Sequence, residues 1–284
     1  MKQLTLSMLA LALCTGVFAQ ADTTKPQTGD TIRVGNMIII KKDGSNTPEE
    51  KTDKKSKDDD DFSVEIKERK SYKPSNISTN WFIVDLGFSN VNDQTNYGSP
   101  AAIAYLPSGD KNSLGLKNGK SANVNLWFFM QRVNVIKHVV NLKYGLGLEL
   151  NNYRYENNVR YRYEPTDFIN RDSITHTKNK LAADYITVPV MLNFNFNPKK
   201  KKSYGVSAGI SAGYLYSARQ KLCSDLRGKE KIKNDFNLEP WKISAIGELN
   251  LGGIRFYGSY ALNNLHKSGL EQTPYNFGIR FSSW

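Results

Sequence analysis

The sequence predicts an all-β protein: an eight-stranded antiparallel transmembrane β-barrel, preceded by a disordered periplasmic N-terminal arm. Three observations lead to this fold class. Polar and apolar residues alternate over many short segments, the connections between these segments are alternately long and short, and the chain begins with a secretory signal. Together they are typical of outer-membrane barrels, which face lipid on the outside and enclose a polar lumen.

The alternation is clearest over residues 139–151. Every second residue there is apolar: Val140, Leu142, Tyr144, Leu146, Leu148 and Leu150. The residues between them are Asn, Lys, Gly or Glu. A period of two indicates a β-strand with two unlike faces, because successive side chains point to opposite sides of a strand.

Eight segments of this kind follow one another, and each predicts one strand of the barrel: 81–90, 121–133, 139–153, 181–196, 204–217, 241–251, 254–263 and 275–284. In the second segment the apolar face is expected to carry Val124, Leu126, Phe128 and Met130. In the first segment that face begins at Phe82.

The connections between these strands alternate in length. The long ones are 91–120, 154–180, 218–240 and 264–274, and the short ones are 134–138, 197–203 and 252–253. Outer-membrane barrels have short periplasmic turns and long external loops. An even number of strands then puts both termini in the periplasm. Within the second long connection, 154–162 and 169–178 are expected to continue the sheet as a hairpin above the membrane.

The N-terminus reads as a signal peptide, with Lys2 before a short apolar run over 4–18 and a cleavage site after Ala19. The predicted organisation is therefore a signal peptide at 1–19, an arm at 20–79 and the barrel at 80–284. The arm contains a highly charged stretch at 41–61 that lacks large apolar residues, and such a composition cannot fold alone. Apolar islands at 32–40 and 62–66 flank this stretch, and each is a candidate for a strand that either pairs with the other or docks at the barrel mouth.

The net charge of +12, from 39 basic and 27 acidic residues, suits anionic surroundings. Behind a signal peptide, those surroundings are expected to be outer-membrane lipid and lipopolysaccharide, and no nucleic acid is expected. The barrel-assembly machinery is a further expected partner, and a periplasmic protein is expected to meet the arm. Once the signal is removed only Cys223 remains, so no disulfide can form within the chain. No metal or cofactor is expected.

The polar face of the strands carries charged side chains, which are predicted to form a structural network inside the lumen: Asp85, Lys143, Glu149, Lys242, Glu248, Arg255 and Arg280. Glycine and serine residues accompany them and leave room in a narrow barrel. Placed outward at the middle of a membrane, each Arg or Lys would cost roughly 2–4 kcal/mol. The polar face is therefore expected to point inward.

The chain resembles the PorT-like outer-membrane β-barrels, a group of small barrels of OmpX size. The residues that carry the resemblance are 184–192 (DYITVPVML), 205–216, 237–241 (NLEPW) leading into Ile246-Gly247, and 275–279 (YNFGI). The resemblance covers about residues 80–284 and implies the fold, an outer-membrane location and an association with protein secretion. It carries over no catalytic or ligand-binding residue.

Barrels of this sort usually close on an aromatic residue that the assembly machinery reads, and the candidates here are Phe281 and Trp284. Trp284 is terminal, but the apolar phase of the last strand ends at Phe281. Either a bulge resets the phase, or Phe281 is the functional end.

The expected role is non-enzymatic: structural, adhesive, or associated with a secretion or envelope machinery. Two alternatives remain open. One is an outer-membrane lipid-modifying enzyme, because His266 and Ser268 have the His-x-Ser spacing of lipid A deacylases. The other is a secreted soluble ligand-binding β-barrel, whose apolar faces would point inward.

Overall fold

A computed structural model describes residues 31–34, 37–40, 74–164, 166–198 and 204–282. The chain divides into two units, 1–71 and 72–284. In the first, β1 (Thr31–Val34) pairs antiparallel with β2 (Met37–Ile40), so the apolar island at 32–40 folds back on itself. The island at 62–66, the predicted signal peptide, the rest of the arm up to residue 73 and Trp284 lie outside the described residues.

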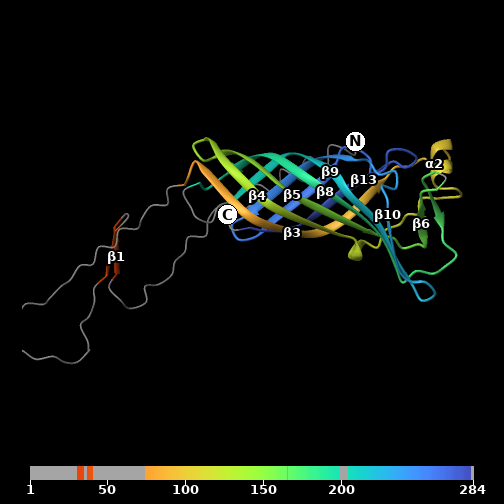
Figure 1. Cartoon of the computed structure of the whole chain (residues 1–284). Helices are drawn as coiled ribbons and strands as arrows, with labels where there is room; N and C mark the ends of the chain where they lie inside the picture. Colours follow the sequence, from red (N-terminus) through yellow and green to blue (C-terminus); the bar gives the residue numbers. More distant parts are fainter. Residues whose placement is uncertain (1–30, 35–36, 41–73, 165, 199–203, 283–284) are drawn as a thin grey trace, which may run out of the picture. The chain divides into compact units, whose positions relative to one another are not determined.

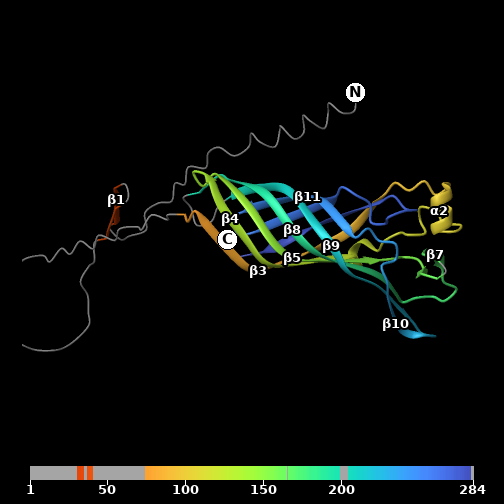
Figure 2. The ribbon, with the colours of Figure 1, turned by 45° about the horizontal axis from the view of Figure 1, so that its top comes forward.

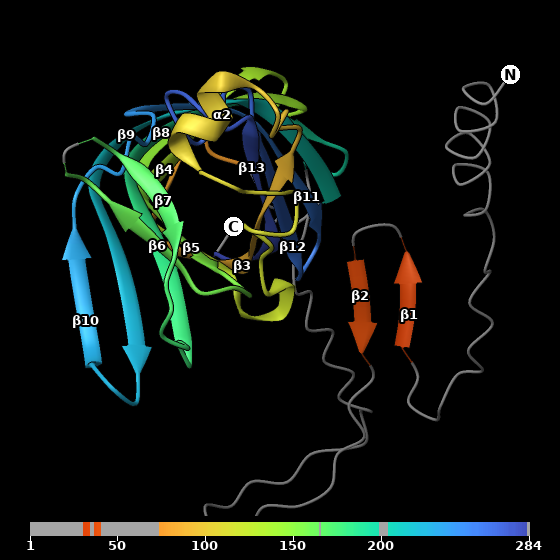
Figure 3. The ribbon, with the colours of Figure 1, turned by 90° about the vertical axis from the view of Figure 1, so that its right-hand side faces the viewer.

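The second unit contains a closed eight-stranded barrel, which confirms the predicted fold class (Figure 1). Its strands are β3 (Ile77–Asp93), β4 (Ala122–Ile136), β5 (Val140–Arg154), β8 (Lys178–Asn195), β9 (Tyr204–Ser224), β11 (Trp241–Leu251), β12 (Arg255–Ala261) and β13 (Gln272–Phe281). Each pairs antiparallel with the next, and β13 closes the ring by pairing with β3. The view along the barrel shows this ring (Figure 3).

The two ends of the barrel differ as the connection lengths predict. One end has the short turns, and both the start of β3 and the end of β13 lie there. The other end has the long loops, which contain α2 (Pro100–Tyr105), the 3-10 turn η1 (Asn118–Lys120) and the hairpin of β6 (Val159–Arg162) and β7 (Phe168–Arg171). β9 also runs past the barrel and pairs with β10 (Gly228–Lys233), and this hairpin projects from the loop end (Figure 2).

The hairpin of β6 and β7 was expected from the sequence, whereas α2 and β10 were not. α2 is short, and local chemistry defines its start. Pro100 occupies the first turn, and the Ser99 hydroxyl accepts a hydrogen bond from the backbone N–H of Ala102 at 3.2 Å. Both features favour a helix N-terminus. β10 has a composition rich in lysine and forms a strand because the long β9 provides an edge for pairing.

Apolar side chains cover the outside of the barrel wall, and polar side chains fill the inside. The exposed apolar side chains include Ile186, Val188, Val190, Leu192, Ile210, Leu249, Phe256, Phe277 and Ile279. Aromatic side chains lie exposed toward strand ends, among them Tyr204, Trp241 and Tyr260. This arrangement is the reverse of a soluble barrel. Among the described residues, no helix is both long and apolar enough to cross a membrane.

The apolar phase of β4 breaks at a place that the sequence pattern does not reveal. Phe82 has a positive φ of 53°, and the register of β4 shifts between Trp127 and Phe129. An extra residue reverses the direction of every side chain beyond it. Met130 was therefore assigned to the wrong face: it was expected outside and is fully buried inside.

Candidate functional site

The lumen contains all seven charged residues that the polar face predicted. Six of them are buried, and the side chain of Glu248 is 8% exposed. Arg280 and Asp85 are register partners on neighbouring strands, and the guanidinium donates two hydrogen bonds to the carboxylate, each 2.7 Å long. A bidentate pair of this kind is strong and fixes the orientation of both side chains.

Glu248 extends this pair across the lumen. From β11 it accepts hydrogen bonds from Lys143 on β5 and from Arg280 on β13. Asp85 additionally accepts from the indole Nε1 of Trp127 at 2.7 Å and from Asn125 Nδ2 at 3.1 Å. Strands from different sides of the ring are thus joined through a shared set of charges.

Glu149 forms a second group. It accepts hydrogen bonds from Lys242 and from the amides of Asn151 and Asn276. Arg255 lies apart from both groups, at the short-turn end, where it donates to the backbone carbonyl of Ser282 at 2.7 Å. The seven residues therefore form two connected groups and one arginine that binds main chain.

Polar uncharged side chains that were not predicted from the sequence complete the lumen. They are buried, and they bind the charges or each other: Asn123, Asn125, Trp127, Asn151, Tyr257 and Asn276. Most of them lie on the polar face of their strands, in alternation with the outward apolar residues, and this spacing would have identified them. A cavity of about 30 Å³ between Trp127, Glu149 and Arg280 is large enough to hold a water molecule.

Aromatic and aliphatic side chains close the loop end of the barrel. They come from the loops and the upper strands and include Tyr105, Leu106, Leu116, Tyr153, Tyr155, Tyr161, Ile169, Leu181, Phe236, Leu238 and Leu270. The Tyr105 hydroxyl donates to the backbone carbonyl of Phe236 at 2.7 Å and ties α2 to the loop after β10. These residues form an apolar layer, here called the lid, over the polar lumen.

His266 lies inside the lid. Its ring is nearly parallel to that of Tyr161, with 6.1 Å between the ring centroids and an interplanar angle of 8°. Its Nε2 lies 3.3 Å from the Tyr161 hydroxyl. Burial lowers the pKa of His266 to about 3, so the ring is neutral at physiological pH. Ser268 is exposed, and its hydroxyl accepts a hydrogen bond from Asn237 at 3.1 Å.

The deacylase alternative requires His266 and Ser268 on one outward face of a strand near the membrane. Both residues instead follow β12 in a loop, and they line a cavity of about 190 Å³ within the loop layer. His266 is 2% exposed. In the described part of the chain, no group of three or more His, Cys, Asp or Glu side chains is placed to hold a metal ion.

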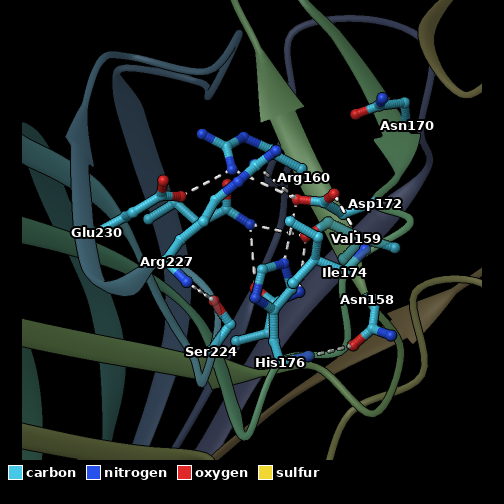
Figure 4. Close-up of polar contacts among 12 residues, drawn as sticks. Asn158, Val159, Arg160, Asn170, Asp172, Ile174, His176, Ser224, Arg227 and Glu230 are labelled. Carbon is cyan, nitrogen blue, oxygen red and sulfur yellow. Dashed lines mark hydrogen bonds and ion pairs between the residues drawn. The ribbon is translucent and has the colours of Figure 1, made fainter.

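Ion pairs join the hairpin of β6 and β7 to the hairpin of β9 and β10 (Figure 4). Arg160 binds Asp172 at 3.3 Å and Glu230 on β10 at 2.7 Å. Asp172 also accepts from His176 Nε2 at 3.2 Å and from the backbone N–H of Ile174 at 3.3 Å. These contacts hold the two projecting hairpins against each other.

We expect Asp172→Asn to loosen the hairpin of β6 and β7. Hydrogen bonds to a charged group contribute about 1.5–3 kcal/mol, so local opening should rise roughly tenfold or more. Trypsin cleavage after Arg162 and Arg171 should quicken accordingly, while Asp225→Asn in the exposed β9–β10 turn should leave it unchanged. Equal cleavage of both variants would contradict the role assigned to Asp172.

A fall in pH should also loosen the hairpin of β6 and β7. Burial raises the pKa of Asp172, but the hydrogen bonds from Ile174, His176 and Arg160 outweigh it, so the pKa lies below its ordinary value. A depressed carboxyl pKa stabilises the folded loop above the unfolded pKa of about 4, and this contribution is lost as the pH falls through the folded pKa. The hairpin should therefore resist proteolysis at neutral pH, and a protease that is active in acid should cleave it faster as the pH falls below the unfolded carboxyl pKa of about 4.

Phe281 is the last residue of β13, and its side chain points outward with 56% of its surface exposed. Trp284 lies outside the described residues, so the choice between these two as the assembly signal stays a prediction.

Residues 82–267 match the family described as "Outer membrane protein beta-barrel domain", which covers more than half of the chain and most of the barrel. No curated protein matches the chain.

Proposed function

Because this chain belongs to the outer membrane protein β-barrel domain family, we propose that it is a non-enzymatic, non-conducting barrel whose loop end serves as a rigid adhesive platform. The observation that supports this proposal is the double closure of the barrel. Paired charges fill the lumen, and the apolar lid covers its loop end. A pore would need a continuous path of water through both.

Conductance tests the first half of the proposal. The full chain, reconstituted in a planar bilayer, should give no steady ion-conducting steps, because an eight-stranded barrel has an interior only wide enough for side chains. Stable open steps at low voltage would overturn the proposal.

Adhesion tests the second half. Cells that display the protein should bind polysaccharide-coated beads, and deletion of residues 157–176 should reduce this binding while the barrel still folds. The hairpin in this segment carries Arg162 and Tyr163, which are partly or fully exposed, beside Asn170, and these side chains are suited to sugars. Binding that survives the deletion would remove the hairpin from the adhesive surface.

The orientation of the barrel is part of the proposal. β3 begins and β13 ends beside the short turns, so periplasmic turns would put both termini in the periplasm. In a Cys223→Ser background, Leu226→Cys in the β9–β10 turn should react with a membrane-impermeant maleimide on intact cells. His138→Cys in the β4–β5 turn should react only after the outer membrane is opened. The reverse pattern would invert the orientation.

Association with a secretion or envelope machinery is a second candidate, supported by the resemblance to PorT-like barrels and by this placement of the N-terminal side. We propose that the arm, residues 20–79, contacts a periplasmic partner. Deletion of residues 22–73 should then abolish co-purification of that partner while the barrel still folds. A partner that remains bound would make the arm a tether only.

A further inference from the structure

Basic side chains gather on the outer face of the wall where β8, β9 and β10 rise above the barrel. The pairing register sets one row directly across four strands: Arg154 on β5, Lys180 on β8, Lys221 on β9 and Lys231 on β10. Directly paired residues of neighbouring antiparallel strands lie on the same face, with Cβ atoms about 4.5–5.5 Å apart. We call these four residues the basic row.

Two further register rows flank the basic row, and both are basic. On one side, Lys178 on β8 and Lys229 on β10 both pair with Cys223 on β9. On the other side, Arg219 on β9 pairs with Lys233 on β10. None of these three rows contains an acidic residue. Of the nearby carboxylates, Asp184 has a side chain that is 3% exposed and is bound by Arg219, and Asp225 lies in the β9–β10 turn.

The opposite face of the same strands is firmly packed. Leu181 belongs to the lid and Leu222 is buried, and the Gln220 side chain accepts a hydrogen bond from the backbone N–H of Tyr161 at 3.0 Å. Glu230, the acid of β10, points to this inner side and binds Arg160. The acidic side chain of β10 therefore lies on the inner face of these strands, and the basic side chains lie together on the outer face.

This concentration of like charge is unfavourable in the protein alone. Like charges directly opposite each other destabilise a sheet. Burial lowers the pKa of Lys180, and Lys178, Arg219 and Lys221 lower it further. Lys180 finds one neutral acceptor, Asn152 Oδ1 at 2.6 Å. An anionic partner would remove the repulsion.

The position of the three basic rows along the barrel indicates which kind of anion they would bind. About 9–11 residues of a tilted strand cross a membrane, and β9 has 21 residues, so its second half stands above the apolar band. Tyr214 and Tyr216 are exposed on β9 just below Arg219. The ring of Tyr214 meets that of Trp241 edge-on, with 5.0 Å between the ring centroids. Such aromatic side chains mark the membrane–water interface. The basic rows therefore begin at the level of the lipid headgroups.

We propose that the three basic rows bind the phosphates of phosphorylated glycolipid in the outer leaflet, and that they anchor a lipid A headgroup against the wall of β8, β9 and β10. The proposal rests on the orientation proposed above, with the loop end outside. Lysines near a membrane surface attract anionic lipid strongly, and the three rows present several within reach of one headgroup.

The experiment uses the full mature chain in neutral detergent, titrated with bisphosphorylated lipid A in mixed micelles. The triple variant Lys180→Gln, Lys221→Gln, Lys231→Gln should bind lipid A at least roughly tenfold more weakly than the wild type. The matched control Lys111→Gln, Lys137→Gln, Lys267→Gln removes the same charge from exposed positions elsewhere and should bind like the wild type. Dephosphorylated lipid A should bind weakly to all three proteins, and inorganic phosphate should not displace lipid A at millimolar concentration.

Thermal stability gives an independent readout. Without lipid A, the triple variant should resist heat at least as well as the wild type, because repulsion is relieved. With lipid A, the wild type should gain more resistance. Equal affinity of the triple variant and its control, or equal binding of dephosphorylated lipid A, would overturn the proposal. Displacement by millimolar phosphate would show an anion site that is not specific for lipid. A wild type that shows no folded barrel in this assay would instead overturn the outer-membrane assignment itself.

Discussion

Asp85→Leu should destabilise the barrel by about 3–5 kcal/mol, the usual cost of removing one partner of a buried ion pair. Asp85 is fully buried and accepts hydrogen bonds from Arg280, Trp127 and Asn125. All of these donors would lose that acceptor together. Urea unfolding in lipid vesicles, followed by tryptophan fluorescence, measures the change.

The double variant Asp85→Leu with Arg280→Met is the control. It removes one charge of each sign and leaves Glu248 with Lys143, so the lumen keeps its charge balance. Replacing a buried pair by apolar residues is often nearly neutral. The double variant should therefore be more stable than Asp85→Leu alone. A double variant that loses the sum of the two single effects would show that the pair does not act as a unit.

Ile210→Arg should cost roughly 2–4 kcal/mol, because it puts a cation on the lipid side near the middle of the part of β9 that lies in the apolar band. Ile210 is 59% exposed and lies in register with Val190 and Ala245, both also on the outer wall. In a soluble barrel the same change at an exposed position would be nearly neutral. Heat resistance of the folded form in vesicles measures the difference.

The matched control is Leu226→Arg, in the β9–β10 turn. Leu226 is 83% exposed but lies beyond the apolar band, so the added charge should meet water and leave stability unchanged. Equal and small effects of both substitutions would contradict a lipid-facing wall.

Period-two alternation was enough to predict the strands of the barrel wall, their order and the inward direction of their charges. It works because each strand has one face on lipid and one in the lumen, and every charge on the wrong face is costly. Residues 241–251 were predicted with the bounds that β11 has. The same reasoning placed Arg280 and Asp85 inside, although it could not show that they are register partners.

The errors arose where local pattern does not determine structure. The bulge near Trp127 reversed Met130, because an extra residue leaves no mark in composition. β10 reads as a polar lysine-rich turn and becomes a strand only beside the extended edge of β9. The basic row escaped notice because its members are far apart in sequence, and only the pairing register brings them together.

Gel mobility of the protein from a fractionated cell envelope, unboiled against boiled, tests the central claim most directly. A barrel with lipid outside and charges inside should be found in the outer-membrane fraction, resist detergent, and change its migration only after heating. Recovery from the soluble periplasmic fraction with no shift on heating would contradict it, because the apolar faces would then have to point inward.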